Sequence, residues 1–312
     1  MRRRERSRRL PTDAVICRAQ EFRDLLPERI FVADGAMGTM LYARGIFINR
    51  CFDELNVTAP RMVGDIHDEY AAAGAEIIET NTFGANRARL AGFGLAEKLE
   101  AINYAGVKLA RQASDASAQR PFVAGSMGPL GLHMEPLGSM PREEARAIFR
   151  EQAEVLCGAG IDLLILETFT DLHELHQAVL AAREAAGSET IIVAQVAVGD
   201  YGDLIGGAST REFARQANGW PIDVIGFNCS VGPQTTLEAL EAVAPFSNKL
   251  LSAIPNAGLP ARVEGRHIYL SSPEYMAQYA RRMLQAGAAI IGGCCGTTPE
   301  HIKLMVSETH LR

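Results

Sequence analysis

The sequence lacks the long apolar segment that a membrane helix requires. No hydrophobic run in its 312 residues reaches the roughly 18 residues of a spanning helix, and no signal-peptide core follows the start. An excess of positive charge is also missing, because the formal net charge is −6. This balance gives no electrostatic reason to bind nucleic acid or an acidic membrane surface. These absences predict a cytoplasmic protein without a nucleic-acid or membrane partner.

Cysteine is scarce as well, with six residues in the chain. In a large cytosolic chain so few cysteines do not form a disulfide framework, and metal-binding or catalytic use is expected. Two of them, Cys294 and Cys295, are adjacent and lie between glycines directly after an apolar run. Neighbouring side chains of a regular strand point to opposite faces, but glycines allow other backbone shapes. If both thiolates reach one centre, a metal with a third ligand from elsewhere is predicted.

An alternation of short apolar runs with helical patterns predicts the fold. Near-continuous apolar runs are typical of strands buried on both faces of a parallel sheet. Eight such runs occur, at 30–36, 76–82, 122–127, 162–168, 191–198, 224–229, 249–255 and 289–293. Helical patterns lie at 59–73, 97–114, 141–160, 171–186, 210–218, 233–243, 273–286 and 299–306. The alternation predicts a single (β/α)8 TIM barrel, with an open doubly wound sheet as the alternative.

The chain divides into a barrel over residues 21–312 and a basic arm over residues 1–20. Six arginines among the first nine residues indicate a solvated, mobile arm. A transit peptide is the alternative, but Glu5 and Asp13 and the lack of an amphipathic pattern argue against it.

Polar residues follow the apolar runs where a barrel places its active site, at the carboxyl ends of the strands. One of them, Cys229, supplies the third thiol, two strands away from Cys294 and Cys295 in a closed barrel. Three thiolates on zinc leave a fourth position open, as in a catalytic site. Copper(I), an iron–sulfur cluster, buried structural cysteines and a vicinal disulfide are the alternatives. Such a metal removes the proton of a substrate thiol and predicts alkyl transfer to sulfur.

Four motifs resemble the homocysteine S-methyltransferase family: Asp34–Thr39, Glu79–Phe83, Gly226–Cys229 and Gly292–Pro299. The resemblance extends from about Ile30 to Ile302 and covers nearly the whole chain after the arm. It implies a TIM barrel that binds Zn²⁺ and L-homocysteine.

The resemblance also assigns roles to individual residues. It implies that Cys229, Cys294 and Cys295 are the zinc ligands and that Asn256 completes the shell in the absence of substrate. Asp34 and Glu167 then hold the homocysteine amino group, and Ser126 with nearby backbone N–H groups receives its carboxylate. Asn81 and Thr82, with Phe83, belong to a segment that faces the methyl donor in some relatives. The single tryptophan, Trp220, precedes a strand and does not lie at the rim, which argues against betaine as the donor.

The predicted activity is zinc-dependent transfer of a methyl group to the thiolate of L-homocysteine, giving L-methionine. The donor is left open. S-methylmethionine or S-adenosylmethionine would make the chain a self-sufficient enzyme, whereas methylcobalamin or methyltetrahydrofolate would make it a module that needs another domain or protein. Two further alternatives are a homocysteine- or zinc-binding regulator without turnover and an enzyme that methylates a related thiol or selenol.

Overall fold

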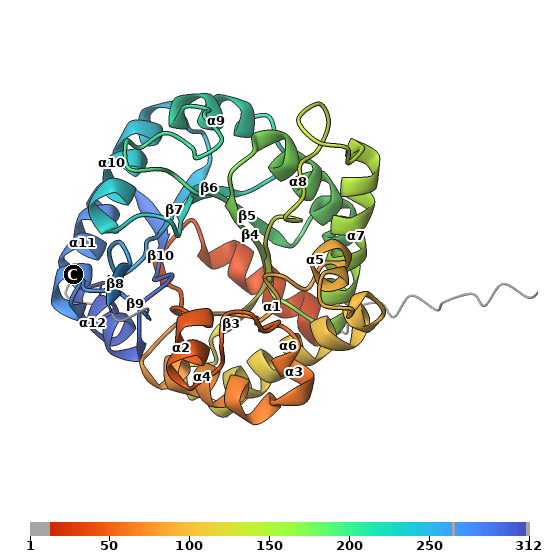
Figure 1. Ribbon diagram of the computed structural model, residues 1–312. Helices are drawn as coiled ribbons and strands as arrows, with labels where there is room; N and C mark the ends of the chain where they lie inside the picture. Colours follow the sequence, from red (N-terminus) through yellow and green to blue (C-terminus); the bar gives the residue numbers. More distant parts are fainter. Residues whose placement is uncertain (1–12, 264–265, 310–312) are drawn as a thin grey trace, which may run out of the picture.

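The computed structural model describes residues 13–263 and 266–309 and contains an eight-stranded parallel barrel (Figure 1). The strands follow the order β1-β10-β7-β6-β5-β4-β3-β2, and a parallel bridge between Ala33 and Ile77 joins the two ends of the sheet. The TIM-barrel prediction is therefore confirmed. The strands are β1 (Phe31–Val32), β2 (Ile77–Glu79), β3 (Phe122–Met127), β4 (Leu163–Phe169), β5 (Ile191–Val196), β6 (Val224–Asn228), β7 (Leu250–Ile254) and β10 (Ala288–Ile291).

All eight predicted helices surround the barrel, with ends within a few residues of the predicted ones. Proline occupies the first turn of four of them, where its missing N–H is not needed. They are α4 (Pro60–Ala72), α6 (Leu99–Ala116), α7 (Arg142–Ala159), α8 (Leu172–Ala186), α9 (Thr210–Ala217), α10 (Pro233–Val243), α11 (Pro273–Gln285) and α12 (Pro299–Thr309). Shorter pieces are α2 (Gly38–Ala43), α3 (Leu55–Thr58), α5 (Arg87–Ala91), η1 (Ala96–Lys98), η2 (Ala244–Phe246) and the hairpin β8 (Ala261–Val263) with β9 (Arg266–Ile268).

The alternation of side chains along each strand decides what fills the barrel interior. Alternate residues such as Ile77, Ala124 and Ile165 belong to one inner apolar cluster, whereas the residues between them pack outward on the helices. Two residues further along the same strands come Glu79, Ser126 and Glu167. Because side chains repeat their direction every second residue, these three polar groups also point into the barrel. They lie at the carboxyl end of the strands, which we call the upper end of the barrel.

The opposite end of the barrel is closed by helix α1 (Asp13–Leu25), which crosses the centre of the view in Figure 1. The Phe22 ring of α1 lies 4.8 Å from the ring of Phe31 and 4.9 Å from that of Phe122. The helix therefore begins before the boundary predicted at residue 20 and contributes to the inner core. The arginine-rich stretch predicted as a mobile arm lies in residues 1–12, outside the described residues.

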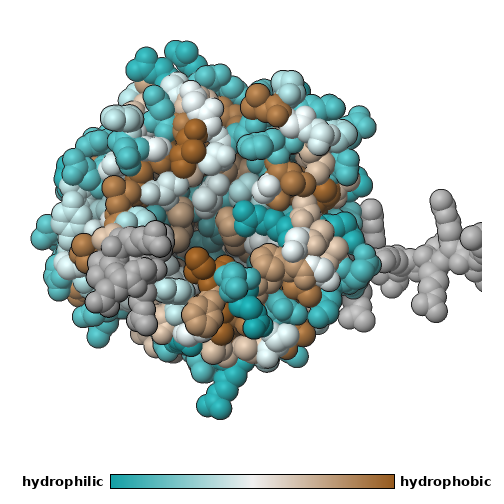
Figure 2. All heavy atoms as spheres, in the orientation of Figure 1, coloured by the Kyte–Doolittle hydropathy of each residue, from teal (hydrophilic) through white to brown (hydrophobic). Residues whose placement is uncertain are grey.

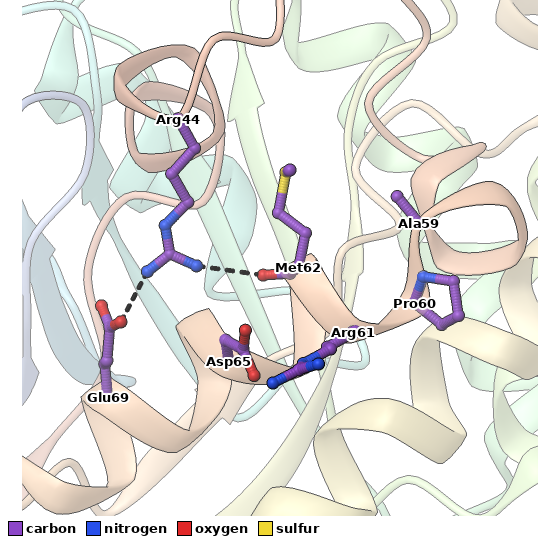
Figure 3. A pocket seen from close by; sticks show the side chains of 7 residues that line it. All are labelled: Arg44, Ala59, Pro60, Arg61, Met62, Asp65 and Glu69. Carbon is purple, nitrogen blue, oxygen red and sulfur yellow. Dashed lines mark hydrogen bonds and ion pairs between the residues drawn. The ribbon is translucent and has the colours of Figure 1, made fainter.

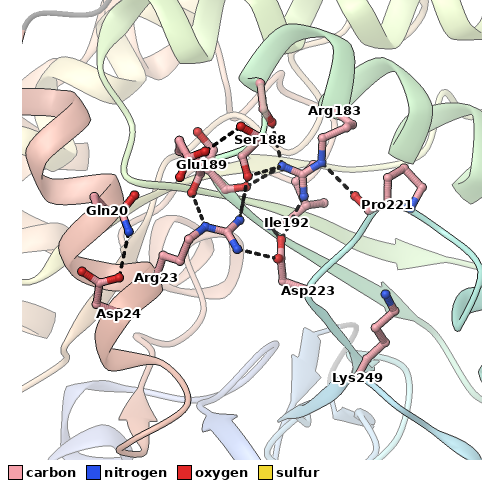
Figure 4. Close-up of polar contacts among 12 residues, drawn as sticks. Gln20, Arg23, Asp24, Arg183, Ser188, Glu189, Ile192, Pro221, Asp223 and Lys249 are labelled. Atoms are coloured by element: carbon pink, nitrogen blue, oxygen red, sulfur yellow. Dashed lines mark hydrogen bonds and ion pairs between the residues drawn. The ribbon is translucent and has the colours of Figure 1, made fainter.

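An ion-pair network fixes α1 to the base of the barrel (Figure 4). Asp223 accepts from Arg23 Nη1 at 3.1 Å, from Arg183 Nη2 at 2.9 Å and from the backbone N–H of Ile192 at 2.9 Å. Arg23 also donates to the backbone carbonyls of Ser188 and Glu189. Two shared guanidinium groups balance one half-buried carboxylate, so the network ties α1 to the ends of α8, β5 and β6.

On the face shown in Figure 2, hydrophobic residues form separate patches among hydrophilic ones. Within the described ranges, no helix is both long enough and apolar enough to cross a membrane.

Candidate active site

Three cysteine thiols converge at the upper end of the barrel. The Sγ atoms of Cys229, Cys294 and Cys295 all lie within 4.8 Å of one another, and those of Cys229 and Cys295 are 3.8 Å apart. Cys229 follows β6 with a left-handed φ of +57°, a conformation that costs roughly 1–2 kcal/mol outside glycine. Hydrogen bonds from its N–H to Ile254 O and from Val231 N to its carbonyl hold it there. The sequence prediction that these thiols meet at one centre is thus matched by the fold.

The close approach of the three thiols gives them different pKa values. Hydrogen bonds from Cys229 and Cys294 lower the pKa of Cys295 to about 3, although burial opposes the shift. Hydrogen bonding to Cys229 and Cys295, together with burial, raises the pKa of Cys294 well above its usual value. One thiolate is therefore already stabilised in the cluster, and a divalent cation would compensate the repulsion that keeps the others protonated.

Hydrogen bonds from the neighbouring loop fix the segment that carries the paired cysteines. The Thr297 hydroxyl accepts from Ala36 N at 3.1 Å and donates to Cys294 O at 2.7 Å. Tyr70, fully buried, donates to the carbonyls of Ala36 and Thr297. At Gly293, any Cβ would lie 2.5 Å from the Thr297 side chain, so glycine is required for this close approach. The β1 and β10 loops therefore form one rigid support for the thiols.

Three carboxyl groups face the thiols across the same cavity: Asp34, Glu79 and Glu167. Asp34 Oδ2 accepts from the backbone N–H of Glu79 at 3.1 Å, and the side chains of Glu79 and Glu167 are hydrogen-bonded to each other. Asp34 and Glu167 were predicted from the sequence, whereas Glu79 was quoted in a motif without a role. Its position two residues after Ile77 on β2 is the signal that could have placed it in the barrel.

Burial raises the pKa of each of these carboxyl groups. For Asp34 the opposing hydrogen bond from Glu79 N is outweighed by burial and by the charge of Glu167. For Glu79, burial is reinforced by the charges of Glu167 and Asp34. Burial likewise outweighs the hydrogen bonds that Glu167 accepts. Such a cluster is unfavourable when ionised alone, and a bound ammonium would relieve it.

Neighbouring polar side chains orient Glu167. Ser126 Oγ donates to its Oε1, and Asn228 Nδ2 donates to its Oε2 at 3.0 Å. Asn228 is adjacent to Cys229 and also bonds Thr168 through N–H···Oδ1 at 2.7 Å. Ser126 was predicted to receive a substrate carboxylate, and in this structure its hydroxyl is engaged with Glu167.

The remaining predicted residues differ in their positions. Asn81 lines the cavity, with Nδ2 donating to Phe52 O and Asn56 Oδ1. Thr82 is fully buried, donates to Ser126 O and does not line the cavity. Thr82 therefore stabilises the end of β3 from outside the cavity.

The donor set fits a thiophilic metal. Three thiolates within reach of one point match the ligands and open fourth position of a catalytic zinc site. Asn256 adds an independent observation, because its Oδ1 is buried without a hydrogen-bond partner. The residues on either side of it are bonded to the cysteine pair, through Cys294 N to Pro255 O and Ala257 N to Cys295 O. A buried amide oxygen without a partner, next to thiols that could hold a metal ion, could serve as a fourth ligand.

A second hollow, between α2 and α4, carries no comparable chemistry (Figure 3). Two arginines, Arg44 and Arg61, line it but no cysteine does, and Arg44 donates to Met62 O at 3.2 Å and to Glu69 at 2.6 Å. The cavity with the thiols and carboxyls is therefore the candidate active site.

Fold and site together define a TIM barrel in which three thiols that could hold a metal ion lie opposite the buried carboxyls of Asp34, Glu79 and Glu167. The family model for homocysteine S-methyltransferase matches residues 31–309, and the chain belongs to that family. It is 33% identical over 293 residues to the methionine synthases of Mycobacterium tuberculosis and Mycobacterium leprae. These matches cover 90% of this chain but 24% of each relative, so the chain spans about a quarter of their length.

A solved structure resembles the chain over most of its length. The metallated form of the homocysteine methyltransferase MmuM from Escherichia coli superimposes with a TM-score of 0.77 at 27% identity. The match covers 92% of this chain and 99% of MmuM. The resemblance to this family stated from the four motifs is thereby confirmed.

Proposed function

We propose that this protein transfers a methyl group to the thiolate of L-homocysteine, giving L-methionine, with zinc held by Cys229, Cys294 and Cys295. The observation that carries the proposal is that these thiols and the carboxyls of Asp34 and Glu167 line one cavity. This arrangement suits an amino acid with a sulfur at one end and an ammonium at the other. Family membership supports the same substrate.

Bound zinc would supply a Lewis acid with a free coordination position, which lowers the pKa of a substrate thiol. The protein positions the other end of the molecule. The ammonium lies among Asp34, Glu79 and Glu167, whose repulsion it relieves. Asn256 would fill the fourth position before homocysteine arrives, since its Oδ1 lacks another partner.

The chemical step requires alignment more than acid–base catalysis. The homocysteine sulfur donates an electron pair to the methyl carbon, and the bond from that carbon to the donor breaks with its pair retained by the donor. The thiol proton has already left to solvent. The rigid loops therefore contribute by holding sulfur and methyl carbon in line.

The test is proton release on homocysteine binding, measured by calorimetry in buffers of different ionisation enthalpy. A thiol of ordinary pKa is largely protonated at pH 7, so coordination should release about one proton beyond that released with L-methionine. The variant Cys229→Ser should lose this difference together with zinc, whereas Cys157→Ser on α7 is the matched control. Equal release by zinc-loaded and zinc-free protein would overturn the proposal.

A further inference from the structure

A tyrosine from the loop before α11 lies against the segment that carries the paired cysteines. Tyr269 directly follows β9 and is half-buried. Its ring packs on Gly296, because any Cβ at that glycine would lie 2.2 Å from Tyr269 Cγ and 2.3 Å from its Cβ. Since Gly296 directly follows Cys295, this packing brings the phenol to the thiol cluster.

The hydroxyl of Tyr269 reaches the thiol cluster of Cys229, Cys294 and Cys295. It is hydrogen-bonded to the Cys295 thiol. Cys229 and Cys294 make the largest contributions to the lowered pKa of Cys295, and the hydrogen bond from Tyr269 adds to them. The cluster therefore has a donor that is not itself a thiol.

Metal binding changes which of these donors remain. Cys229 and Cys294 lose their protons when their sulfurs bind a metal ion, and a thiolate cannot donate a hydrogen bond. A tyrosine hydroxyl has an ordinary pKa of about 10 and keeps its proton at pH 7. Of the three side chains that donate to Cys295, Tyr269 is therefore the one that can still do so in the metal-loaded protein.

Backbone hydrogen bonds fix the loop that carries Tyr269 to the loop that carries Cys295. Ala257 N donates to Cys295 O at 2.9 Å, and Ser271 N donates to Ala257 O at 3.0 Å. Tyr269 lies two residues before Ser271 and is thereby held close to this contact. The hydroxyl and the thiol are thus parts of one connected framework.

A histidine joins the same two loops from the other side. His301 Nδ1 accepts from Thr298 N at 3.1 Å, so the ring proton lies on Nε2, which donates to Ser271 O at 3.0 Å. The ring is 7% exposed. Because Thr298 belongs to the loop after β10, this bridge holds the chain near Tyr269 against the cysteine segment.

We propose that Tyr269 is a positioning residue of the metal centre, whose hydroxyl donates to the Cys295 thiolate and disperses its negative charge. This inference rests on the metal site of the proposed function. The three thiolates carry one more negative charge than a divalent cation balances, and homocysteine would add a fourth. A hydrogen bond to a ligand thiolate offsets part of this excess and tunes the ligand.

The first test uses cobalt(II) in place of zinc, with Tyr269→Phe, which keeps the ring on Gly296 and removes the hydroxyl alone. The sulfur-to-cobalt charge-transfer band should move to longer wavelength, because a thiolate without its hydrogen bond gives up electron density more easily. Zinc affinity, measured by competition with a chelator, should fall roughly 10- to 100-fold. Tyr275→Phe is the matched control, since its hydroxyl is hydrogen-bonded to Tyr279 and it does not line the cavity.

Two results of this test would overturn the proposal. An unchanged band and an unchanged zinc affinity in Tyr269→Phe would limit Tyr269 to packing on Gly296. A cobalt spectrum in the parent protein that Cys229→Ser leaves unaltered would refute the metal centre of the proposed function, and the role of Tyr269 with it.

The second test compares L-homocysteine with L-methionine by calorimetry on the zinc-loaded protein. Both compounds have the same ammonium and carboxylate, but only homocysteine adds a thiolate. Tyr269→Phe should weaken homocysteine by roughly three- to tenfold and leave L-methionine unchanged. Equal weakening of the two would contradict the charge role of Tyr269. A shifted cobalt band together with homocysteine binding that does not depend on zinc would refute the proposed transfer and support the bond from Tyr269 to Cys295.

Discussion

Asn228 Nδ2 lies 3.0 Å from Glu167 Oε2 and donates a hydrogen bond to it. Because Asn228 directly precedes Cys229, this contact joins the buried carboxyls to the thiol cluster. The same side chain accepts from Thr168 N at 2.7 Å, where the backbone has a left-handed φ of +62°. One amide therefore sets the position of a carboxyl and of a strained strand end together.

Replacement of Asn228 should affect both halves of the site. Asn228→Ala removes the donor to Glu167 Oε2 and leaves Thr168 N without a partner, and we expect a loss of about 2 kcal/mol in stability and at least a tenfold increase in the homocysteine KM. Asn218→Ala is the matched control, since the Asn218 side chain likewise joins two segments, donating to Phe246 O and accepting from Asn248 N, at the other end of the barrel. A homocysteine KM that rises equally in the control would contradict this role.

The crowding of carboxyls predicts that Glu79 is destabilising in the absence of substrate. Glu79→Gln removes a carboxyl group whose ionisation is penalised by burial and by the charges of Glu167 and Asp34, so the zinc-free variant should be more stable than the parent protein at pH 7. A raised pKa in the folded state means that ionisation penalises folding as the pH increases, so the gain should shrink towards pH 4.

The same substitution should weaken homocysteine binding, because the ammonium loses one partner. Denaturant unfolding at several pH values and the homocysteine KM together check the prediction, with the exposed Glu97→Gln as control. A gain in stability that does not change with pH, or a gain in stability without loss of affinity for homocysteine, would count against Glu79 as a partner of the homocysteine ammonium.

A buried histidine predicts a separate dependence of stability on pH. His67 on α4 is fully buried, both ring nitrogens lack partners, and burial lowers its pKa from 6.5 to about 4. The unfolded chain takes up a proton below pH 6.5 while the folded protein does not, so stability should fall between pH 6.5 and 4, by about 3 kcal/mol.

The variant His67→Leu should lose that part of the pH dependence and keep its stability at pH 7. Unfolding curves measured from pH 4 to 7 for both proteins give the difference directly. If the free energy of unfolding depends on pH in the same way in both proteins, His67 takes up its proton in the folded protein as readily as in the unfolded chain.

The sequence could predict the barrel because its signals repeat. Apolar runs such as Leu163–Phe169 are buried on both faces, and proline at the start of helices such as α10 marks the boundaries. Closure of the barrel by α1 could not be predicted in this way, because its one inward-facing ring, Phe22, follows an arginine-rich start. The charge pattern alone indicated a solvated segment.

Site residues on strand ends were predictable, and those on loops were not. Asp34 and Glu167 follow apolar runs, and Glu79 obeys the same two-residue period. Asp53 lies in a turn and Arg89 on the short helix α5, both within the loops after β1 and β2, where no strand period relates sequence position to direction. Their meeting depends on the packing of the β1 and β2 loops against each other.

The central claim is that homocysteine sulfur joins the three protein thiolates, and zinc-edge X-ray absorption tests it most directly. The zinc-loaded protein should show three sulfur ligands and one lighter atom, contributed by Asn256 or water. Saturation with homocysteine should replace the lighter atom and give four sulfur ligands. A sulfur count that stays at three when homocysteine is bound would contradict the account.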